Sequence, residues 1–423
     1  MIKSLLKGGA IYALSDLLRK LVPFILLPLF VTNLSVEEFG RLEYITIIST
    51  LMAYLVGWGS VQGLLRLYVV DGPKYTCVTL QIITASFLVL MSGIYLLSRA
   101  LDLALLFDLQ SIKILFVCGL YGWLFAVTNV AFTILRIEER LREFAAYNLL
   151  SALLQISAIS VLLIVMKQGV MSKVYGLVSS YSLMLVVLLF TVMRRKIVLV
   201  FSFNLVKKAL SFFTPITLNN LLGWWGSSID KLAVKSLLGD EALGIYSFIH
   251  QLVQVFKLGV ESFFKSFNVL LYKRLEMKSI LDKHQFLLIG MLQIIGLAYV
   301  GTIGLMSSQG FFSNYQVVGS VLIMLALSRT LMLANYIEVL RYYVEIDSKT
   351  VLKANVVAAI LLTISVSIFV ESWGAAGAAF SVVLSALSNY TILCWKRDGK
   401  PSLVLKKLLV SAVPWLVLLF LFA

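Results

Sequence analysis

The sequence contains little charge, cysteine or histidine for its length. Only 13% of its 423 residues are Asp, Glu, Lys or Arg, and 60% are hydrophobic. A soluble domain has about a quarter charged and half apolar residues. The three cysteines (Cys77, Cys118, Cys394) lie in or beside apolar stretches and are interpreted as small hydrophobic residues, not as a disulfide framework. With only two histidines, no histidine-based metal site is expected, so we predict no metal ligands.

Apolar stretches about 20 residues long recur along the whole chain, which predicts an all-α polytopic membrane protein. The stretches lack the alternation of barrel strands, and no cleavage site for a signal peptide follows the first of them. We expect spans near 9–34, 40–65, 76–98, 112–135, 144–166, 173–193, 209–236, 242–270, 285–307, 315–341, 350–370 and 374–395. A further segment, 404–422, is interrupted by Pro414 and is either a thirteenth span or an interfacial or re-entrant segment.

The net charge of +15 is distributed unevenly between alternate loops. Of the 36 Lys and Arg residues, 25 fall on the side of the N-terminus and 6 on the opposite side. The positive-inside rule therefore predicts a cytoplasmic N-terminus, and the basic excess indicates topology, with no nucleic-acid partner. The remaining five cations lie inside predicted spans: Arg19, Lys20, Lys231, Lys257 and Arg329.

An internal repeat relates the two halves. "LSVEEFGRL" (34–42) follows the first span and "LGDEALGIY" (238–246) follows the seventh, so that Glu37 matches Glu241 and Gly40 matches Gly244. Both halves begin on the same side, which predicts two parallel six-helix lobes around a central cavity. We expect an N-terminal lobe at 1–200, a C-terminal lobe at 201–397, and a basic linker with the hydrophobic segment at 398–423.

Polar residues inside the eighth span occupy one helical face. They are His250, Gln254, Lys257, Glu261 and Lys265, at spacings of four, three, four and four. Lipid does not accommodate such a face, so we predict that it lines a hydrated cavity. The alternative is a buried ion-pair ladder from Lys257 through Glu261 to Lys265 that serves only packing.

Other spans have similar faces. In the first span Asp16 and Lys20 are i,i+4 partners, with Arg19 beside them. The seventh span carries Asn220, Asp230 and Lys231, and the tenth carries Arg329, Asn335 and Glu338. Together these faces predict a V-shaped, cationic cavity lined by spans 1, 2, 7 and 8. A two-lobed bundle around such a cavity suits alternating access for an anionic cargo, since no channel filter sequence is present.

The stretch "LLKGGAIYALSDLLRKLVPFILLPLFVTNLSVEEFGRLEY" (5–44) resembles the opening of Wzx-type polysaccharide flippases. These belong to the multidrug/oligosaccharidyl-lipid/polysaccharide (MOP) exporter superfamily. "DKLAVKSLLGDEALGIYSF" (230–248) is similar to the middle of the same family, and span number and short loops extend the resemblance over the whole chain.

The resemblance implies a cargo and a location. The cargo is an undecaprenyl-pyrophosphate-linked oligosaccharide, turned from the inner to the outer leaflet of the bacterial cytoplasmic membrane for O-antigen or capsule synthesis. Membrane lipids and the polymerase and chain-length proteins of the same pathway are its implied partners. No cofactor is expected, and coupling to H⁺ or Na⁺ stays open. The family pattern implies that cavity cations of spans 1 and 8 contact the head group, here Arg19, Lys20, Lys257 and Lys265. We add the hypothesis that Arg66 at the cytoplasmic mouth and the cavity cations Lys231 and Arg329 also contact it. The remaining polar side chains of the cavity would line it and balance its charge: Asp16, His250, Gln254, Glu261, Asn220, Asp230, Asn335 and Glu338.

Three alternative functions fit the sequence less well. An ion-coupled multidrug exporter of the same superfamily needs embedded carboxylates, but each embedded acid here has a basic neighbour. A membrane polysaccharide polymerase is expected to have a long outer loop, which this chain lacks. A structural scaffold gives no reason for so many charges at mid-membrane, so the sequence predicts a transporter and not an enzyme.

Overall fold

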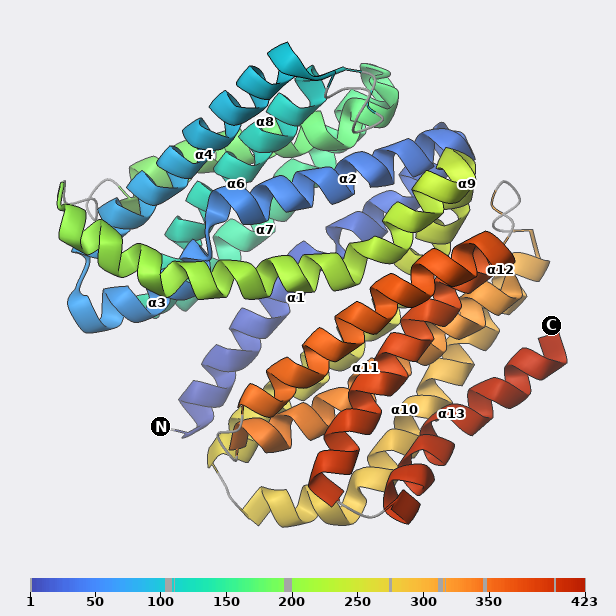
Figure 1. Cartoon of the computed structure of the whole chain (residues 1–423). Coiled ribbons are helices and arrows are strands. Elements are labelled where there is room, and N and C mark those ends of the chain that lie inside the picture. The colour runs from blue at the N-terminus through green and yellow to red at the C-terminus, as the bar shows by residue number, and fades with distance from the viewer. Residues whose placement is uncertain are drawn as a thin grey trace. The chain divides into compact units, whose positions relative to one another are not determined.

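A computed structural model describes the backbone of residues 2–102, 109, 111–193, 200–273, 276–310, 315, 317–344, 348–398 and 401–422. Side chains are described from residue 17 onward, except 103–108, 110, 194–199, 259–285, 288 and several short stretches after residue 310. In these ranges the regular structure is helical, as Figure 1 shows. The predicted fold class, an all-α polytopic membrane protein, is confirmed.

Packing divides the chain into two compact units. Unit 1 comprises Met1–Leu34 and Arg41–Trp224, and unit 2 comprises Ser35–Gly40 and Trp225–Ala423. The divide therefore falls inside a helix, and the short segment Ser35–Gly40 belongs to the second unit. The predicted lobes, with a boundary at residue 200, stay a prediction.

Unit 1 is built from helices that match the predicted spans closely. They are α1 (Ile2–Asn33), α2 (Val36–Gly57, from Arg41 onward), α3 (Ser60–Asp71), α4 (Lys74–Ala100), α6 (Lys113–Ile137), α7 (Leu141–Ser160), α8 (Ser172–Leu188) and the first part of α9 (Phe203–Lys273). Short turns η1 (Val161–Val165), η2 (Gly169–Met171) and η3 (Leu189–Met193) extend or precede α7 and α8. A shared apolar core forms between α4, α6 and α8, with Val78, Val130 and Leu188 fully buried.

Unit 2 contains the rest of α9, α10 (Glu276–Ser308), α11 (Gly319–Val344), α12 (Ser348–Asp398) and α13 (Pro401–Phe422). Helices α10 to α13 lie side by side, with α11 against both α12 and α13 (Figure 1). Small side chains such as Ala354 and Ala379 are fully buried there. Small residues allow membrane helices to approach closely, where van der Waals contact drives association.

Helices α9 and α12 each hold two predicted spans, separated by a glycine. Gly239 has φ 87° and Gly374 has φ 59°, backbone conformations that side chains with a Cβ rarely adopt. Tyr246 bonds back to Asp230 across the first glycine, and Asn389 bonds back to Asn355 across the second. Each glycine therefore reverses the chain direction and forms a helical hairpin.

The predicted span 40–65 lies within the candidate span Val36–Asp71, but its helix is broken in the middle. The helix ends at Gly57, and α3 starts at Ser60, because Trp58 (φ 44°) and Gly59 (φ 61°) both adopt left-handed conformations. Gly59 also lies against the backbone carbonyl of Phe213, where a side chain would clash. Trp58 donates a hydrogen bond from Nε1 to Thr214 Oγ1 (3.3 Å), so α9 holds the break in place.

Eight helical segments of the described chain are long and apolar enough to cross a membrane. They are Val36–Asp71, Lys74–Ala100, Lys113–Ile137, Leu141–Val165, Gly169–Met193, Ile289–Ser308, Gly319–Val339 and Lys349–Lys396. The last contains the reversal at Gly374, so its two arms correspond to the predicted spans 350–370 and 374–395. The full set of twelve spans stays a prediction.

The C-terminal segment is a packed helix of unit 2. Helix α13 contacts α10 and α11, and its fully buried Trp415 donates a hydrogen bond to Gln293. Lys407 Nζ lies 3.0 Å from Glu338 Oε1 on α11, and each side chain is only 1% exposed. Lys407 is therefore a buried partner of Glu338, although the sequence predicts no partner for it.

Removing one member of this ion pair should destabilise unit 2. Lys407→Met leaves the Glu338 carboxylate buried without its cation, which costs about 3–5 kcal/mol of unfolding free energy. The double variant Lys407→Met/Glu338→Leu should regain most of this loss, because no charge is then left buried. Thermal unfolding in detergent measures both, with Lys353→Met, an exposed lysine of α12, as control. A Lys407→Met protein as stable as the control would contradict a structural role of the pair.

Candidate functional site

Three basic side chains of unit 2 lie around His250, which is on the second arm of α9. The charges of Lys231, Lys257 and Arg329 all act on the His250 ring, which is itself 8% exposed. We call these four residues (Lys231, His250, Lys257 and Arg329) the cationic cluster. The α9 hairpin supplies three of them, and α11 supplies Arg329, so the reversal at Gly239 assembles the cluster. The sequence predicted each residue as a cavity cation or cavity lining, and the structure brings the four together.

The Arg329–His250 contact fixes the hydrogen-bonding state of the histidine. Arg329 Nη2 lies within hydrogen-bond distance of His250 Nε2, and Nη1 lies 3.1 Å from the Met332 sulfur. A guanidinium group only donates hydrogen bonds, so His250 Nε2 accepts and the ring proton resides on Nδ1. His250 therefore orients a buried arginine without adding charge.

One carboxylate lies next to the cluster. Asp230, 2% exposed, accepts a hydrogen bond at Oδ2 from Tyr246 OH (2.8 Å), and both Asp230 and Arg329 act on the Tyr246 hydroxyl. Lys231 donates to the carbonyl oxygen of Ser227 (3.1 Å) on its own helix. Among the described charged side chains that act on His250 and Tyr246, three permanent cations thus accompany one acid. In a low-dielectric surrounding this excess favours an anion.

Another predicted cavity cation, Arg19 of α1, belongs to unit 1. Its Nη1 is 3.5 Å from Asn129 Oδ1 on α6, and its guanidinium carbon lies 5.4 Å from the centre of the Phe132 ring. Asn129 is itself fixed by donating from Nδ2 to Phe125 O (2.8 Å). A half-buried arginine over an aromatic ring retains an accessible charge while its stem is packed.

Three other predicted residues lie in unit 1. Lys20 is exposed next to Arg19 on α1, and Asn220 is half-buried on the first part of α9. Arg66 is exposed on α3, with its guanidinium carbon 5.2 Å from the centre of the Phe212 ring. Arg66 is thus held by an aromatic side chain of α9 at the end of unit 1 predicted to be cytoplasmic.

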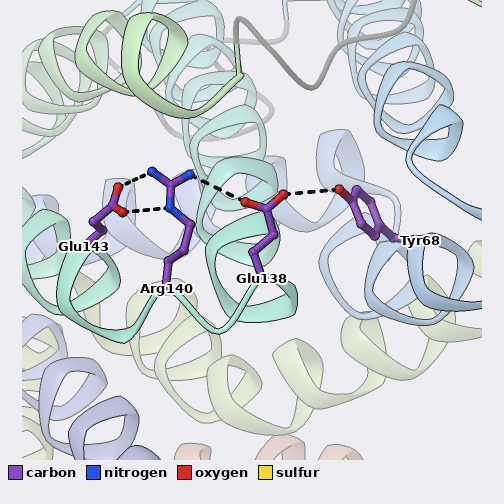
Figure 2. Close-up of polar contacts among 4 residues, drawn as sticks. All are labelled: Tyr68, Glu138, Arg140 and Glu143. Carbon is purple, nitrogen blue, oxygen red and sulfur yellow. Dashed lines mark hydrogen bonds and ion pairs between the residues drawn. The ribbon is translucent and has the colours of Figure 1, made fainter.

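Arginines at the same predicted end differ in their partners. Figure 2 shows Arg140, in the turn between α6 and α7, bonded to Glu143 and paired with Glu138, which Tyr68 also contacts. Arg140 Nε lies 2.7 Å from Glu143 Oε1, and this hydrogen bond raises the pKa of Arg140. Arg140 therefore stabilises the turn between α6 and α7, whereas the guanidinium group of Arg66 lies at an exposed surface.

Two residues predicted to line the cavity contact neighbouring helices instead. Glu338 pairs with Lys407, and Asn335 donates to Asn389 Oδ1 (3.1 Å), which continues to Asn355 (2.8 Å). Tyr342, on the same face, donates to Leu393 O (2.8 Å). This polar face of α11 is therefore a helix–helix contact with α12 and α13, because a membrane helix satisfies polar side chains against its neighbours.

A second buried ion pair that the sequence did not predict joins α8 to α2. Lys173 lies on α8 with Nζ 2.7 Å from Glu43 Oε1 on α2, and it is 5.9 Å from the centre of the Phe30 ring of α1. The sequence signal that could have indicated this pair is Glu43, the lone acid in the apolar run "FGRLEYITII".

The side chains of Asp16, Glu261 and Lys265 lie outside the described residues, and Gln254 is half-buried on α9.

Comparisons with known proteins agree with this architecture. The model of a family described as "Polysaccharide biosynthesis protein" matches residues 33–268, and no curated protein matches the chain. The lipid II flippase MurJ in an inward closed conformation has a similar structure, with TM-score 0.72 and 14% identity over 97% of this chain and 91% of that one.

Two further solved structures are similar over most of their length. A MOP superfamily transporter from Pyrococcus furiosus Vc1 (DSM3638) has TM-score 0.63 and 14% identity, covering 96% of each chain. A multidrug resistance MATE family transporter in an inward-facing conformation has TM-score 0.67 and 15% identity, covering 94% of this chain and 99% of that one.

The helices and the buried charges thus define a multi-pass membrane protein with the fold of MOP superfamily transporters. The chain belongs to the polysaccharide biosynthesis protein family, whose model covers more than half of it. The resemblance to polysaccharide flippases of this superfamily is confirmed at the level of family and fold.

The hydrogen-bonding role of His250 predicts unequal effects of two substitutions. His250→Leu removes the acceptor from a buried arginine and should cost about 1.5–3 kcal/mol of unfolding free energy. His250→Gln supplies an amide oxygen in its place and should retain most of the stability. Thermal unfolding of the two purified variants tests this, and equal losses for both would show that Nε2 is not a required acceptor.

Proposed function

We propose that the protein is a flippase for undecaprenyl-pyrophosphate-linked oligosaccharide units, which it turns from the inner to the outer leaflet of the bacterial cytoplasmic membrane. The observation that carries this proposal is the cationic cluster, in which the described side chains of the α9 hairpin and α11 bring Lys231, Lys257 and Arg329 to His250, with Asp230 beside them. Each embedded charge costs roughly 2.5–3.5 kcal/mol at a helix centre on insertion scales. An anionic cargo offsets that cost, and the family membership supports a polysaccharide precursor as that cargo.

The arginine and lysine side chains would bind the pyrophosphate in different ways. Arg19 and Arg329 have planar guanidinium groups that can grip two phosphate oxygens at once, whereas Lys20, Lys231 and Lys257 act as point charges. His250 and Asn129 orient the two arginines, so less rotamer freedom is lost when the anion binds. Arg66 and Lys265 would attract the head group at the cytoplasmic mouth of a central cavity, while Asp16 and Glu261 balance charge in the empty state.

A multidrug exporter of the same superfamily is the second candidate, since MATE structures share the fold. Such a pump requires embedded carboxylates that are accessible to protons, Na⁺ or cationic drugs. In the described part of the membrane helices, Glu43 pairs with Lys173, Glu338 with Lys407, and Asp230 with Tyr246. The excess of cations favours the anionic cargo, and we propose transport without catalysis, by alternating access.

Removal of single cavity cations should reduce transport. Arg19→Ala, Lys20→Ala and Lys257→Ala each lose a charge-assisted hydrogen bond of about 1.5–3 kcal/mol, equivalent to about 10- to 100-fold in affinity. Export measured by complementation of flippase-null bacteria that make defined repeat units should fall accordingly at unchanged membrane levels. Lys349→Ala, an exposed residue at the start of α12, is the matched control and should export normally.

The type of cation should matter as well as its charge. Arg19→Lys loses both the fork geometry and the stacking on Phe132, so it should reduce export more than Lys257→Arg. If Lys257 and Glu261 served only helix packing, the uncharged double variant Lys257→Met/Glu261→Leu should export normally. If Lys257 binds pyrophosphate, the same variant should lose export. Normal export by this neutral pair in the same complementation assay would disprove a pyrophosphate-binding role of Lys257.

The proposed orientation places the N-terminus and residues 194–208 in the cytoplasm, as the positive-inside rule indicates. Phe201→Cys, at an exposed site before α9, should react with an impermeant thiol reagent only after the cells are opened. Leu101→Cys, exposed at the end of α4, should react from outside. The native cysteines Cys77, Cys118 and Cys394 are buried and provide a low background. Labelling of Phe201→Cys in intact cells would show that the protein has the opposite orientation.

A further inference from the structure

A row of side chains on α6 begins beside Arg19 and continues as aromatic rings. Tyr121, Phe125 and Asn129 follow one another at intervals of four residues, so they lie on one face of this helix. Asn129, at one end of the row, contacts the guanidinium group of Arg19. The row therefore starts at a proposed phosphate ligand and runs along α6 toward its N-terminus, entirely within unit 1.

The two rings of this row pack against a third ring from α8. Between ring centres, Tyr121 lies 5.8 Å from Phe125 and 5.8 Å from Tyr181, and Phe125 lies 5.6 Å from Tyr181. Tilted and edge-on pairs at such distances are favourable. Tyr181 is buried and shares a hydrogen bond with Gln155 of α7, which also donates to Ser151 Oγ (3.0 Å). We call the three rings the aromatic face.

A fourth aromatic side chain reaches the aromatic face from α2. Tyr54 is 37% exposed, and its hydroxyl group acts electrostatically on that of Tyr121. The two helices approach closely at Gly122, where a Cβ would lie 3.0 Å from backbone atoms of Met52 and Ala53. The glycine at this crossing therefore brings Tyr54 and Tyr121 to adjoining positions.

The aromatic face lies within reach of a group bound at Arg19. The charge of Arg19 acts on the hydroxyl groups of both Tyr121 and Tyr181. The helical rise of 1.5 Å per residue places Phe125 about 6 Å and Tyr121 about 12 Å beyond Asn129 along α6. Tyr121 and Phe125 are half-buried, so they retain accessible ring surface next to the arginine.

This combination of groups suits a sugar ring. The C–H groups of a pyranose pack on aromatic rings, and its hydroxyl groups need hydrogen-bond partners, which tyrosine hydroxyl groups at the edge of the rings provide. A lipid tail has no use for those hydroxyl groups. A cationic ligand, which could also lie on the rings, is repelled by Arg19.

We propose that Tyr54, Tyr121 and Phe125 bind the sugar that is joined directly to the pyrophosphate, while Arg19 holds the pyrophosphate itself. The inference deepens the function proposed above and rests on it, because it takes a lipid-linked saccharide as the cargo. In that cargo the first sugar is bonded to a phosphate, so a phosphate held at Arg19 brings the sugar to the aromatic face. Contact through ring C–H groups is common to many sugars, and the site therefore recognises the presence of a pyranose.

Binding of matched lipids to the purified full-length protein separates the sugar contact from the anion contact. The probes are undecaprenyl pyrophosphate alone and the same lipid carrying one N-acetylglucosamine or one galactose, titrated in detergent with tryptophan fluorescence as the readout. The unsubstituted protein should bind both sugar-bearing lipids more tightly than the sugar-free one. Tyr121→Leu and the exposed Tyr54→Leu should each weaken binding of the sugar-bearing lipids about threefold to tenfold, as loss of an aromatic contact does, and leave the sugar-free lipid unaffected.

Two further variants complete the test. Arg19→Ala should weaken binding of all three lipids. Tyr95→Leu is the matched control, because Tyr95 is another tyrosine of unit 1 beside an arginine, with the guanidinium carbon of Arg99 5.3 Å from its ring centre, but it lies on α4. It should bind every lipid as the unsubstituted protein does.

The outcomes distinguish the sugar site from the proposed function. Equal affinity of the unsubstituted protein for sugar-bearing and sugar-free lipids would overturn the sugar site. Unchanged binding by both Tyr121→Leu and Tyr54→Leu, or equal weakening of all three lipids by both, would overturn it as well. Failure of the unsubstituted protein to bind any of the lipids would instead contradict the proposed function.

Discussion

The cost of placing charge inside apolar helices constrains the rest of this structure. A membrane helix cannot leave Lys, Arg, Asp or Glu facing lipid, so each must meet a counter-charge, a polar partner or a cargo. Lys173 meets Glu43, and Lys407 meets Glu338, in both cases with nearly complete burial. These pairs join helices that are distant in sequence, α2 with α8 and α11 with α13. The cost of a charge inside the membrane therefore also favours the packing of those helices whose charges can pair.

A different solution applies around His250. Here a histidine that accepts a hydrogen bond from Arg329 lies under the influence of Lys231 and Lys257. A purely structural interior gains nothing from gathering cations, because like charges in low dielectric repel. Among the described side chains, cations from both arms of α9 and from α11 converge on one histidine here, and this convergence is the physical basis for proposing anion recognition.

Glycine gives the helices their turns and their close approaches. Gly239 and Gly374 reverse α9 and α12, and without the first reversal Lys231 and His250 would lie on distant parts of one long helix. Gly40 and Gly244 act differently, since they let two helix starts touch through the backbone. The repeat in the sequence thus becomes a local symmetry in the fold, and the same offset that aligns the motifs aligns their contacts.

Hydropathy and helical periodicity are local properties of the chain, so they predict the helical membrane class, the placement of nearly all helices and the cationic character of spans 1, 7, 8 and 10. They do not predict which side chains pair with one another. Glu338 and Asn335 share a polar face with Arg329, yet only tertiary packing directs them to α13 and α12 while Arg329 contacts His250. The break at Trp58 was likewise invisible, since it depends on α9 lying against Gly59. Helical periodicity predicts which residues share a face, and only the tertiary structure shows which helices that face contacts.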